Sequence, residues 1–507
     1  MGPTVVVCGV LAGLSLLGPS EPSFDPWAWL VWGREIAHGS LDIASGPSWK
    51  PLPVVFTTLF APLSAVDDSI PRALWMVVAR TGGLVAVVLS FKLAARLAGG
   101  GRARRAIAGV VAAVALVTTP DWTRYLFHGS EAPLTIALLL WAVDRHLDDR
   151  PDWALVLGGT ACLARPELFP FLALYGSFLW ARSPRSRVLV AAVPATVVAA
   201  WVIPPWLSTG DPLSAEATAR SEPSWSLSLS PTPWRAALDV AQDQSWLVLE
   251  LAACAAVALA LAGRSGGVRL PRPAHPAVVV TLGAYAATMV ALFMGMTEAG
   301  FSGNPRYVFP AAAAISLVGA VGVALAVEVA WQLGARAKWA HGRPRVAGAL
   351  VAGAAATVLA AAGAPDLSGQ LDAARAEARD SVERSRLHAQ LDRAVDAVGA
   401  SYVTRFGPAT VNRSFQTHLA WELSLHLEDV HGTAGQGIVF RAPEEPVAGV
   451  VRIYRRARRR MTIATVGSWT VSARPPNARH VYTWPVARFN LRSAAKRVAA
   501  GGSPSGT

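Results

Sequence analysis

Two oppositely charged side chains lie in a polar segment between apolar stretches near the N-terminus. Asp25 belongs to residues 23–27, and Lys50 opens the run Lys50-Pro51-Leu52-Pro53. If the flanking stretches enter a membrane, an acid and a base at its edge are costly unless they are paired or functional. A carboxylate can take a proton from an attacking hydroxyl, and a lysine can bind an anionic leaving group. The segment is therefore a candidate reaction site.

The composition is that of a membrane protein. The chain has 507 residues, of which 53% are hydrophobic and only 16% are charged, and its mean hydropathy is +0.37. Soluble proteins carry charge on about a quarter of their residues. Because the apolar residues come in long blocks, the sequence predicts a polytopic α-helical membrane protein. Its net charge of +13 is then no nucleic-acid footprint, and no nucleic-acid partner is expected.

Apolar blocks predict about eleven transmembrane helices, the first of them a retained signal anchor. The predicted spans are 4–18, 73–91, 106–119, 132–147, 153–164, 168–181, 188–206, 246–263, 277–296, 307–332 and 346–363. Segment 53–66 is short and contains two prolines, which favours an interfacial or re-entrant helix. An odd number of spans puts the two termini on opposite sides of the membrane.

The distribution of basic residues predicts the orientation. With the N-terminus in the cytoplasm, the inner loops hold 17 Lys and Arg residues, whereas the longer outer loops hold 8. This asymmetry follows the positive-inside rule. We therefore expect a multi-pass protein of the bacterial inner or plasma membrane, in contact with membrane lipids, with a cytoplasmic N-terminus and an extracytoplasmic C-terminal part.

The character of the chain changes after residue 363. We predict a transmembrane domain over 1–363, with a first outer loop at 19–72, and a small extracytoplasmic α/β domain over 364–507. Its charged helical pattern at 371–398 is broken near Ser385. Short β-type runs occur at 401–406, 437–441, 450–454 and 461–473, and a disordered tail is expected from about 498. The basic run 455–460 is either a solvated turn or a contact for anionic headgroups.

The predicted topology brings widely separated polar residues to the outer side, each near the end of an apolar block. They are Asp25, Lys50, Glu131, Arg165, Glu167, Glu298, Asn304 and Arg306. Such a convergence of acids and bases suits a site that acts on a charged, lipid-attached substrate. Transfer from a sugar phosphate needs a base for the acceptor hydroxyl and cations for the departing phosphate. One carboxylate base suffices for an inverting displacement.

The motifs around these residues have a characteristic order. After Asp25 come Lys50-Pro51-Leu52-Pro53, Ser130-Glu131-Ala132-Pro133-Leu134, Ala164-Arg165-Pro166-Glu167 and Asn304-Pro305-Arg306-Tyr307-Val308-Phe309-Pro310. This order resembles the GT-C membrane glycosyltransferases over most of residues 1–310, in particular the branch of the protein O-mannosyltransferases and the lipid A aminoarabinose transferase. The part beyond 363 resembles actinobacterial members, and a ratio of 42 Arg to 4 Lys suggests a high-GC genome.

The resemblance implies roles for particular residues. Asp25 matches the catalytic base, and Glu131 matches a second acid of the site. Lys50 and Arg306 match the residues that bind the donor phosphate. The sequence departs from the family at Pro26, where a second acid is common, and at Lys50-Pro51-Leu52-Pro53, where the family has Lys-Pro-Pro-Leu. The possible substrate-binding residues are Arg165, Glu298, Trp49 and Trp27.

Each residue also has a structural interpretation. Asp25 could cap the helix that follows it, and Lys50 could extend to the headgroups. Glu131 could complement a helix N-terminus, and Arg306 could be an interfacial anchor. Arg165 and Glu167 could form a structural ion pair. Most outer tryptophans are expected to form an interfacial belt, with some covering a sugar or a polyprenyl chain; they are Trp27, Trp29, Trp32, Trp49, Trp122, Trp206, Trp225 and Trp234.

The sequence contains no recognisable metal or nucleotide motif. Cys8, Cys162 and Cys254 all lie in apolar blocks without ligand spacing, so neither a disulfide nor a zinc site is expected. His38 and His128 have no partners at ligand spacing. No Walker or nucleotide-binding glycine motif occurs. We therefore predict no cofactor, although the sequence does not exclude a divalent metal.

These observations predict an inverting glycosyltransferase. The resemblance implies a polyprenyl-phosphate sugar as donor, and the outward site implies a glycan, lipid or protein of the cell envelope as acceptor. The alternatives are a transporter or flippase of a lipid-linked or anionic substrate, and a non-catalytic membrane scaffold. Transporters place ionisable residues near mid-depth and often contain repeats, and no such repeat is recognisable here.

Overall fold

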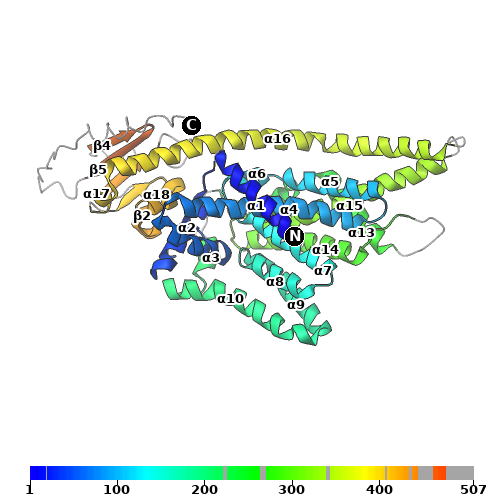
Figure 1. The fold of residues 1–507 in the computed structure, drawn as a ribbon, viewed down its shortest axis with the longest axis horizontal. Coiled ribbons are helices and arrows are strands. Elements are labelled where there is room, and N and C mark those ends of the chain that lie inside the picture. The colour runs from blue at the N-terminus through cyan, green and yellow to red at the C-terminus, as the bar shows by residue number, and fades with distance from the viewer. Residues whose placement is uncertain are drawn as a thin grey trace, which may run out of the picture. The chain divides into compact units, whose positions relative to one another are not determined.

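Figure 1 shows the fold of the chain in a computed structural model. The structure describes residues 1–18, 20–220, 225–262, 270–337, 343–405, 408–432, 437–442 and 461–474. The chain divides into two compact units, Met1–Glu383 and Arg384–Thr507. The predicted domain boundary at residue 363 lies inside a long helix that ends in the second unit.

Helices make up the first unit. They are α1 (Gly2–Leu14), α2 (Phe24–His38), α3 (Pro51–Phe60), α4 (Ser69–Ala98), α5 (Arg102–Val117), α6 (Trp122–Phe127), α7 (Ala132–Leu147), α8 (Pro151–Cys162), α9 (Phe169–Arg182), α10 (Arg187–Thr209), α11 (Ser214–Ala219), α12 (Pro233–Asp243), α13 (Leu247–Leu261), α14 (Pro276–Glu298), α15 (Phe309–Arg336) and α16 (Pro344–Val398). Short 3-10 turns cover Ser15–Leu17, Ala61–Ala65, Pro166–Leu168, Pro184–Ser186, Leu227–Leu229 and Pro305–Tyr307.

Five of the described helices are long and apolar enough to cross a membrane. They include α4, α10, α14 and α15, together with the first part of α16 at Pro344–Ala364. The pair α12 and α13, bent by 89°, makes a sixth if it forms one broken span. Each of the eleven predicted spans coincides with a helix. The helices of the remaining predicted spans do not by themselves reach the length and hydropathy that a membrane crossing requires. The helical membrane protein is thus confirmed, and the count of eleven stays a prediction.

The core of the first unit centres on α15, which packs closely on α13. Gly319 and Gly322 of α15 lie against the backbone of α13, where a Cβ at Gly319 would come within 2.5 Å of the Leu249 carbonyl oxygen. A Cβ at Gly322 would overlap the Ala252 carbonyl group. Small residues at such a contact let two membrane helices approach closely, which increases van der Waals packing.

Because of this contact, we expect a larger side chain at Gly322 to destabilise the protein strongly. Gly322→Leu should separate α13 from α15 and lower the free energy of unfolding by at least about 1–3 kcal/mol. The measurement is the midpoint of thermal unfolding in detergent. Gly295→Leu is the matched control, because Gly295 lies in α14 with no atom within 4 Å of its hypothetical Cβ. Equal midpoints for the two variants would contradict the prediction.

The two ends of α7 have different electrostatic surroundings. At its C-terminal end, Asp144 accepts from Lys92 of α4 at 2.8 Å and from Arg145 at 2.6 Å. At its N-terminal end lies Glu131. The two acids are thirteen positions apart, which corresponds to about 20 Å along the helix. The basic residues Lys92 and Arg145 therefore lie at one end of the helical bundle. The candidate residue Glu131 lies at the other end.

The segment predicted as the first outer loop folds into α2 and α3, which lie together at one end of the bundle (Figure 1). Trp27, Trp29 and Trp32 of α2 are buried, and so are Trp49 and Trp122. The prediction of an interfacial belt is wrong for these five, because their rings form core contacts such as that of Trp29 with Trp75. Trp206, Trp225 and Trp234 are exposed, as a belt requires.

The second unit contains a mixed sheet next to the end of α16. Its elements are α17 (Ala400–Arg405), β1 (Ala409–Val411), α18 (Gln416–Glu422), β2 (Val430–His431), β3 (Gly437–Arg441), β4 (Met461–Val466) and β5 (Trp469–Arg474). The strand order is β2-β1-β3-β5-β4, with β1 parallel to β2 and β3 and the other pairs antiparallel. Ile438 of β3 pairs with Ala409 and Ala473, and Trp469 and Phe415 pack edge-to-face in the core.

Several predictions for this unit can be compared with the structure. The run 401–406 was expected as a strand, but its first five residues belong to α17, and α16 continues through Ser385 without the expected break. The strand at 437–441 is confirmed, and 461–473 is a hairpin that turns at Gly467, whose φ is positive. The run 450–454, the basic run 455–460 and the tail from 498 lie outside the described residues.

Candidate active site

Asp25 is held in the first turn of α2. Ser23, not Asp25, is the N-cap residue, so the capping interpretation of Asp25 is wrong. Pro26 follows without strain, because a proline in the first helical turn lacks an N–H group that would have no partner there. The Asp25 carboxylate is therefore free for tertiary contacts, and it accepts a hydrogen bond of 2.7 Å from Nη1 of Arg306.

Arg306 is held by the turn that precedes α15. The Asn304 side chain accepts a hydrogen bond from the backbone N–H of Arg306 at 3.0 Å and one from its Nε at 3.3 Å. An Asx turn of this kind replaces a backbone turn and fixes the start of the 3-10 segment. This turn orients the guanidinium of Arg306 toward Asp25, which lies 281 positions earlier in the chain.

Lys50 and Glu131 form the centre of the site. Nζ of Lys50 lies 2.6 Å from Oε1 of Glu131 and 3.6 Å from Oδ2 of Asp25. Lys50 is buried and also lies 5.3 Å from the centroid of the Trp29 ring. The interpretation of Lys50 as a side chain that extends to the headgroups is therefore wrong. Glu131 precedes α7 but makes no side-chain cap, because its carboxylate is bound by cations.

A second layer lies behind Glu131. Nη2 of Arg165 lies 2.8 Å from Oε1 of Glu131, and its Nη1 lies 3.4 Å from Oε1 of Glu167. The Ser130 hydroxyl donates to Oε2 of Glu131 at 3.1 Å, and Arg165 lies over the ring of Tyr307 at 5.6 Å. The expected pair of Arg165 and Glu167 is present as one part of a larger network.

We call these six residues the ion cluster: Asp25, Lys50, Glu131, Arg165, Glu167 and Arg306. Their side chains differ in exposure: Glu131 is 0%, Glu167 1%, Arg165 3%, Lys50 11%, Asp25 17% and Arg306 22% exposed. The cluster thus has a buried side around Glu131 and a solvent-accessible side formed by Asp25 and Arg306, with Lys50 at the border between them. Only the accessible side can meet a substrate without rearrangement.

The neighbouring cations keep Asp25 and Glu131 ionised. Burial alone would raise the pKa of Asp25, but Arg306 and Lys50 outweigh it, so this pKa lies below its ordinary value. Burial is likewise outweighed at Glu131, whose pKa is lowered by Lys50, Arg165 and Arg306. Burial lowers the pKa of Lys50, with Glu131 opposing it. A set of three cations facing carboxylates suits an anionic ligand that can replace one of those carboxylates.

At Glu167, the remaining acid of the ion cluster, burial is the dominant effect on the pKa. It raises the pKa of Glu167, and the opposing effect of Arg165 is not sufficient to reverse this. The pKa values of Glu131 and Glu167 are therefore shifted in opposite directions. Such divergence between neighbouring carboxyl groups is typical of functional sites, although structural ion networks also produce it.

Three predicted site residues lie outside the ion cluster. Glu298 at the end of α14 accepts a hydrogen bond from the backbone N–H of Trp234 at 3.1 Å. Trp49 is buried and donates from its ring to the Ala200 carbonyl at 3.0 Å. Trp27 is buried with Arg72 over its ring at 5.8 Å. None of these contacts involves a member of the ion cluster.

Sequence reasoning also missed some members of the site. Trp29 was grouped with the tryptophans expected in the belt or over a sugar or polyprenyl chain, and not with the charged residues of the site. The contact of Tyr307 with Arg165 was not foreseen. The signal for Trp29 was present, since it lies four residues after Asp25 and so on the same helical face. No spacing in the sequence points to the contact of Tyr307 with Arg165, because it depends on the tertiary approach of the 3-10 turn Pro305–Tyr307 to the residue that precedes the turn Pro166–Leu168.

Comparison with known proteins rests on structure. No protein-family model and no curated protein sequence matches the chain. The crystal structure of ArnT from Cupriavidus metallidurans bound to undecaprenyl phosphate matches with a TM-score of 0.52 and 13% identity, over 93% of this chain and 98% of that one. The chain has the fold of ArnT. The apo structure of ArnT gives a TM-score of 0.48 over the same shares.

The fold shared with ArnT, together with the long apolar helices, confirms the predicted polytopic helical membrane protein. The likeness does not extend to the protein O-mannosyltransferase branch or to an actinobacterial source, which stay predictions. The orientation in the membrane and the roles of the site residues also stay predictions. At 13% identity, the shared property of this chain and ArnT is the fold.

Proposed function

We propose that this chain is an inverting glycosyltransferase that moves a sugar from a polyprenyl-phosphate donor to an extracytoplasmic acceptor of the cell envelope. The observation that carries the proposal is the accessible side of the ion cluster. There a carboxylate, Asp25, lies 2.7 Å from Arg306 and 3.6 Å from Lys50. The ArnT structure of the same fold holds undecaprenyl phosphate, which supports a polyprenyl phosphate as the lipid part of the donor.

The two cations would bind the phosphate of the donor. Arg306 can contact two phosphate oxygens with its planar guanidinium, while Lys50 acts as a point charge. The phosphate and Asp25 would compete for the same cations, so donor binding would displace the carboxylate from Arg306. Asp25 would then lose one of the two cations that lower its pKa and would become a stronger base.

The proposed reaction is a single displacement at the anomeric carbon. The acceptor hydroxyl oxygen attacks the anomeric carbon from the face opposite the phosphate and gives its proton to Asp25. The bond between the anomeric carbon and the phosphate oxygen breaks, and the polyprenyl phosphate leaves with the electron pair. Lys50 and Arg306 stabilise the charge that develops on this oxygen. The anomeric configuration is inverted because there is one displacement.

Glu131 would be a positioning residue. Its side chain is 0% exposed and bound by Lys50 and Arg165, so it would hold these cations rather than contact substrate. Arg165 would not contact the donor and would affect its binding only by holding Glu131 in place. Of the residues proposed from the sequence to contact substrate, Asp25, Lys50 and Arg306 are the three that border the accessible side.

The proposed orientation places the ion cluster outside. The cluster lies at one end of α7, and the basic residues Lys92 and Arg145 lie at the other end. The positive-inside rule puts the latter in the cytoplasm. The C-terminal unit would then be extracytoplasmic, with the N-terminus in the cytoplasm.

The proposal is tested by mass analysis of the cell envelope from a strain that lacks the gene. We expect one sugar residue to be absent from a glycan, lipid or protein, with restoration by the wild-type gene. The polyprenyl-phosphate sugar should accumulate on the outer side of the membrane. Accumulation on the inner side would indicate a flippase, and an unchanged envelope would contradict the proposal.

A further inference from the structure

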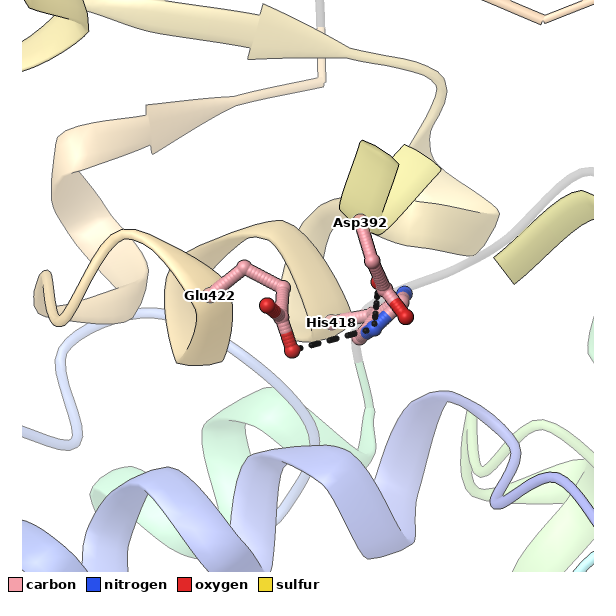
Figure 2. A group of neighbouring side chains, drawn as sticks. All are labelled: Asp392, His418 and Glu422. Carbon is pink, nitrogen blue, oxygen red and sulfur yellow. Dashed lines mark ion pairs between the residues drawn. The ribbon is translucent and has the colours of Figure 1, made fainter. Parts of the chain in front are cut away.

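The second unit contains a cluster of side chains with no role in the chemistry above. Asp392 of α16 and His418 and Glu422 of α18 converge on one point, as Figure 2 shows. Nε2 of His418 lies 2.9 Å from Oδ1 of Asp392 and 3.5 Å from Oε1 of Glu422. We propose that these three residues bind a divalent transition-metal ion, with zinc as its representative.

The distances fit a metal site. Zinc bonds imidazole nitrogen and carboxylate oxygen at about 2.0–2.2 Å, so two ligand atoms of a tetrahedral site lie about 3.3 Å apart. The two distances from the His418 nitrogen lie on either side of this value, and the three ligand atoms are all within 4.8 Å of one another. A small closing movement of the carboxylates would complete the geometry.

Hydrogen bonding alone accounts less well for the arrangement. Nε2 of an imidazole carries at most one hydrogen, and that hydrogen cannot point along two different lines to Asp392 and Glu422. A cation at the shared point bonds all three atoms at once and neutralises both carboxylates. One imidazole with two carboxylates favours zinc or a similar ion over Mg²⁺, which prefers an octahedral set of oxygen ligands.

The local structure holds the ligands in place. His418 and Glu422 are one helical turn apart on α18, so they lie on the same face. The ring of His388, one turn before Asp392 on α16, stacks on His418 with centroids 4.4 Å apart. His418 is only 1% exposed, whereas Asp392 and Glu422 are 36% and 27% exposed. An ion can therefore enter from the carboxylate side and keep a water molecule there.

The test is the zinc content of the full-length protein, purified in detergent without a polyhistidine tag. After chelation and reloading with Zn²⁺, we expect about one more zinc per chain in the wild type than in the double variant Asp392→Asn, Glu422→Gln. Asp396→Asn should retain the ion, because Asp396 is exposed on α16 one turn beyond Asp392. Zinc should also raise the unfolding midpoint of the wild type and not that of the double variant.

Equal zinc content in the wild type and the double variant would overturn the proposal. Loss of zinc from Asp396→Asn as well would overturn it too. The amide substitutions preserve side-chain size, and the unfolding midpoints without zinc show whether the variants are folded. Saturation by Mg²⁺ in place of Zn²⁺ would also contradict the assigned ion class.

Discussion

Asp25→Asn is expected to lower sugar transfer about 10²- to 10⁴-fold, the usual loss when a general base is removed. The amide has the same size and can still accept a hydrogen bond from Arg306, but it cannot take the proton of the acceptor hydroxyl. The measurement is the rate of sugar incorporation into the envelope of the deletion strain expressing each variant at the wild-type level.

Asp68→Asn is the matched control for this experiment. Asp68 is an exposed aspartate of the same first outer segment, and it precedes α4 without a side-chain cap. Its substitution should leave transfer unchanged. If Asp25→Asn transferred sugar as fast as Asp68→Asn, another residue would have to be the base.

Glu131→Ala should have the largest effect on stability. The variant leaves Lys50 and Arg165 buried without the carboxylate that lies 2.6 and 2.8 Å from them. Removing one partner of a buried ion pair costs about 3–5 kcal/mol, because the remaining charge is uncompensated. Transfer should fall as well, since Lys50 loses the contact that positions it for the phosphate.

Asp372→Ala provides the comparison for Glu131→Ala. Asp372 pairs with Arg375 at 2.8 Å, but the two side chains are 74% and 70% exposed, and exposed pairs contribute about 0–1 kcal/mol. The unfolding midpoint in detergent should therefore fall much further for Glu131→Ala. A similar fall in both variants would mean that the ion cluster is not the stabilising network described above.

The pKa of Glu131 determines how its contribution to the stability of the protein depends on pH. Because its pKa in the folded protein lies below the ordinary value of 4.5, the ionised carboxylate stabilises the fold fully above about that pH. The stabilisation is lost as the pH falls through the folded pKa. Between pH 5 and pH 7, the difference in midpoint between the wild type and Glu131→Ala should therefore stay constant.

Some of this architecture could be predicted from the sequence because it depends on local composition and order. Apolar blocks predict transmembrane helices, and basic loops predict which side of the membrane each loop faces. Residues such as Asp25 and Arg306 could therefore be assigned to the same end of the helical bundle from the sequence. The resemblance of the motif order to the GT-C enzymes implied the fold class, and the fold shared with ArnT confirms its coarser part, a polytopic helical membrane protein.

Other features could not be predicted because they depend on tertiary packing. The burial of Trp29 and Trp32 arises from the folding of α2 and α3 into a packed layer, which a hydropathy pattern does not distinguish from a loop with a tryptophan belt. Likewise, nothing in the sequence around Glu131 indicates that its side chain is wholly buried. The run 401–406 contains β-type residues, yet most of it is helical in the fold.

Binding of undecaprenyl phosphate to the purified protein tests the account most directly, because Asp25 and the donor phosphate are proposed to compete for Arg306. Asp25→Asn should bind this lipid more tightly than the wild type, and Arg306→Gln should bind it about tenfold more weakly, which corresponds to about 1.4 kcal/mol. Undecaprenol, which lacks the phosphate, should not distinguish the variants. If both substitutions weakened binding, or neither changed it, the ion cluster would not be the site of the donor phosphate.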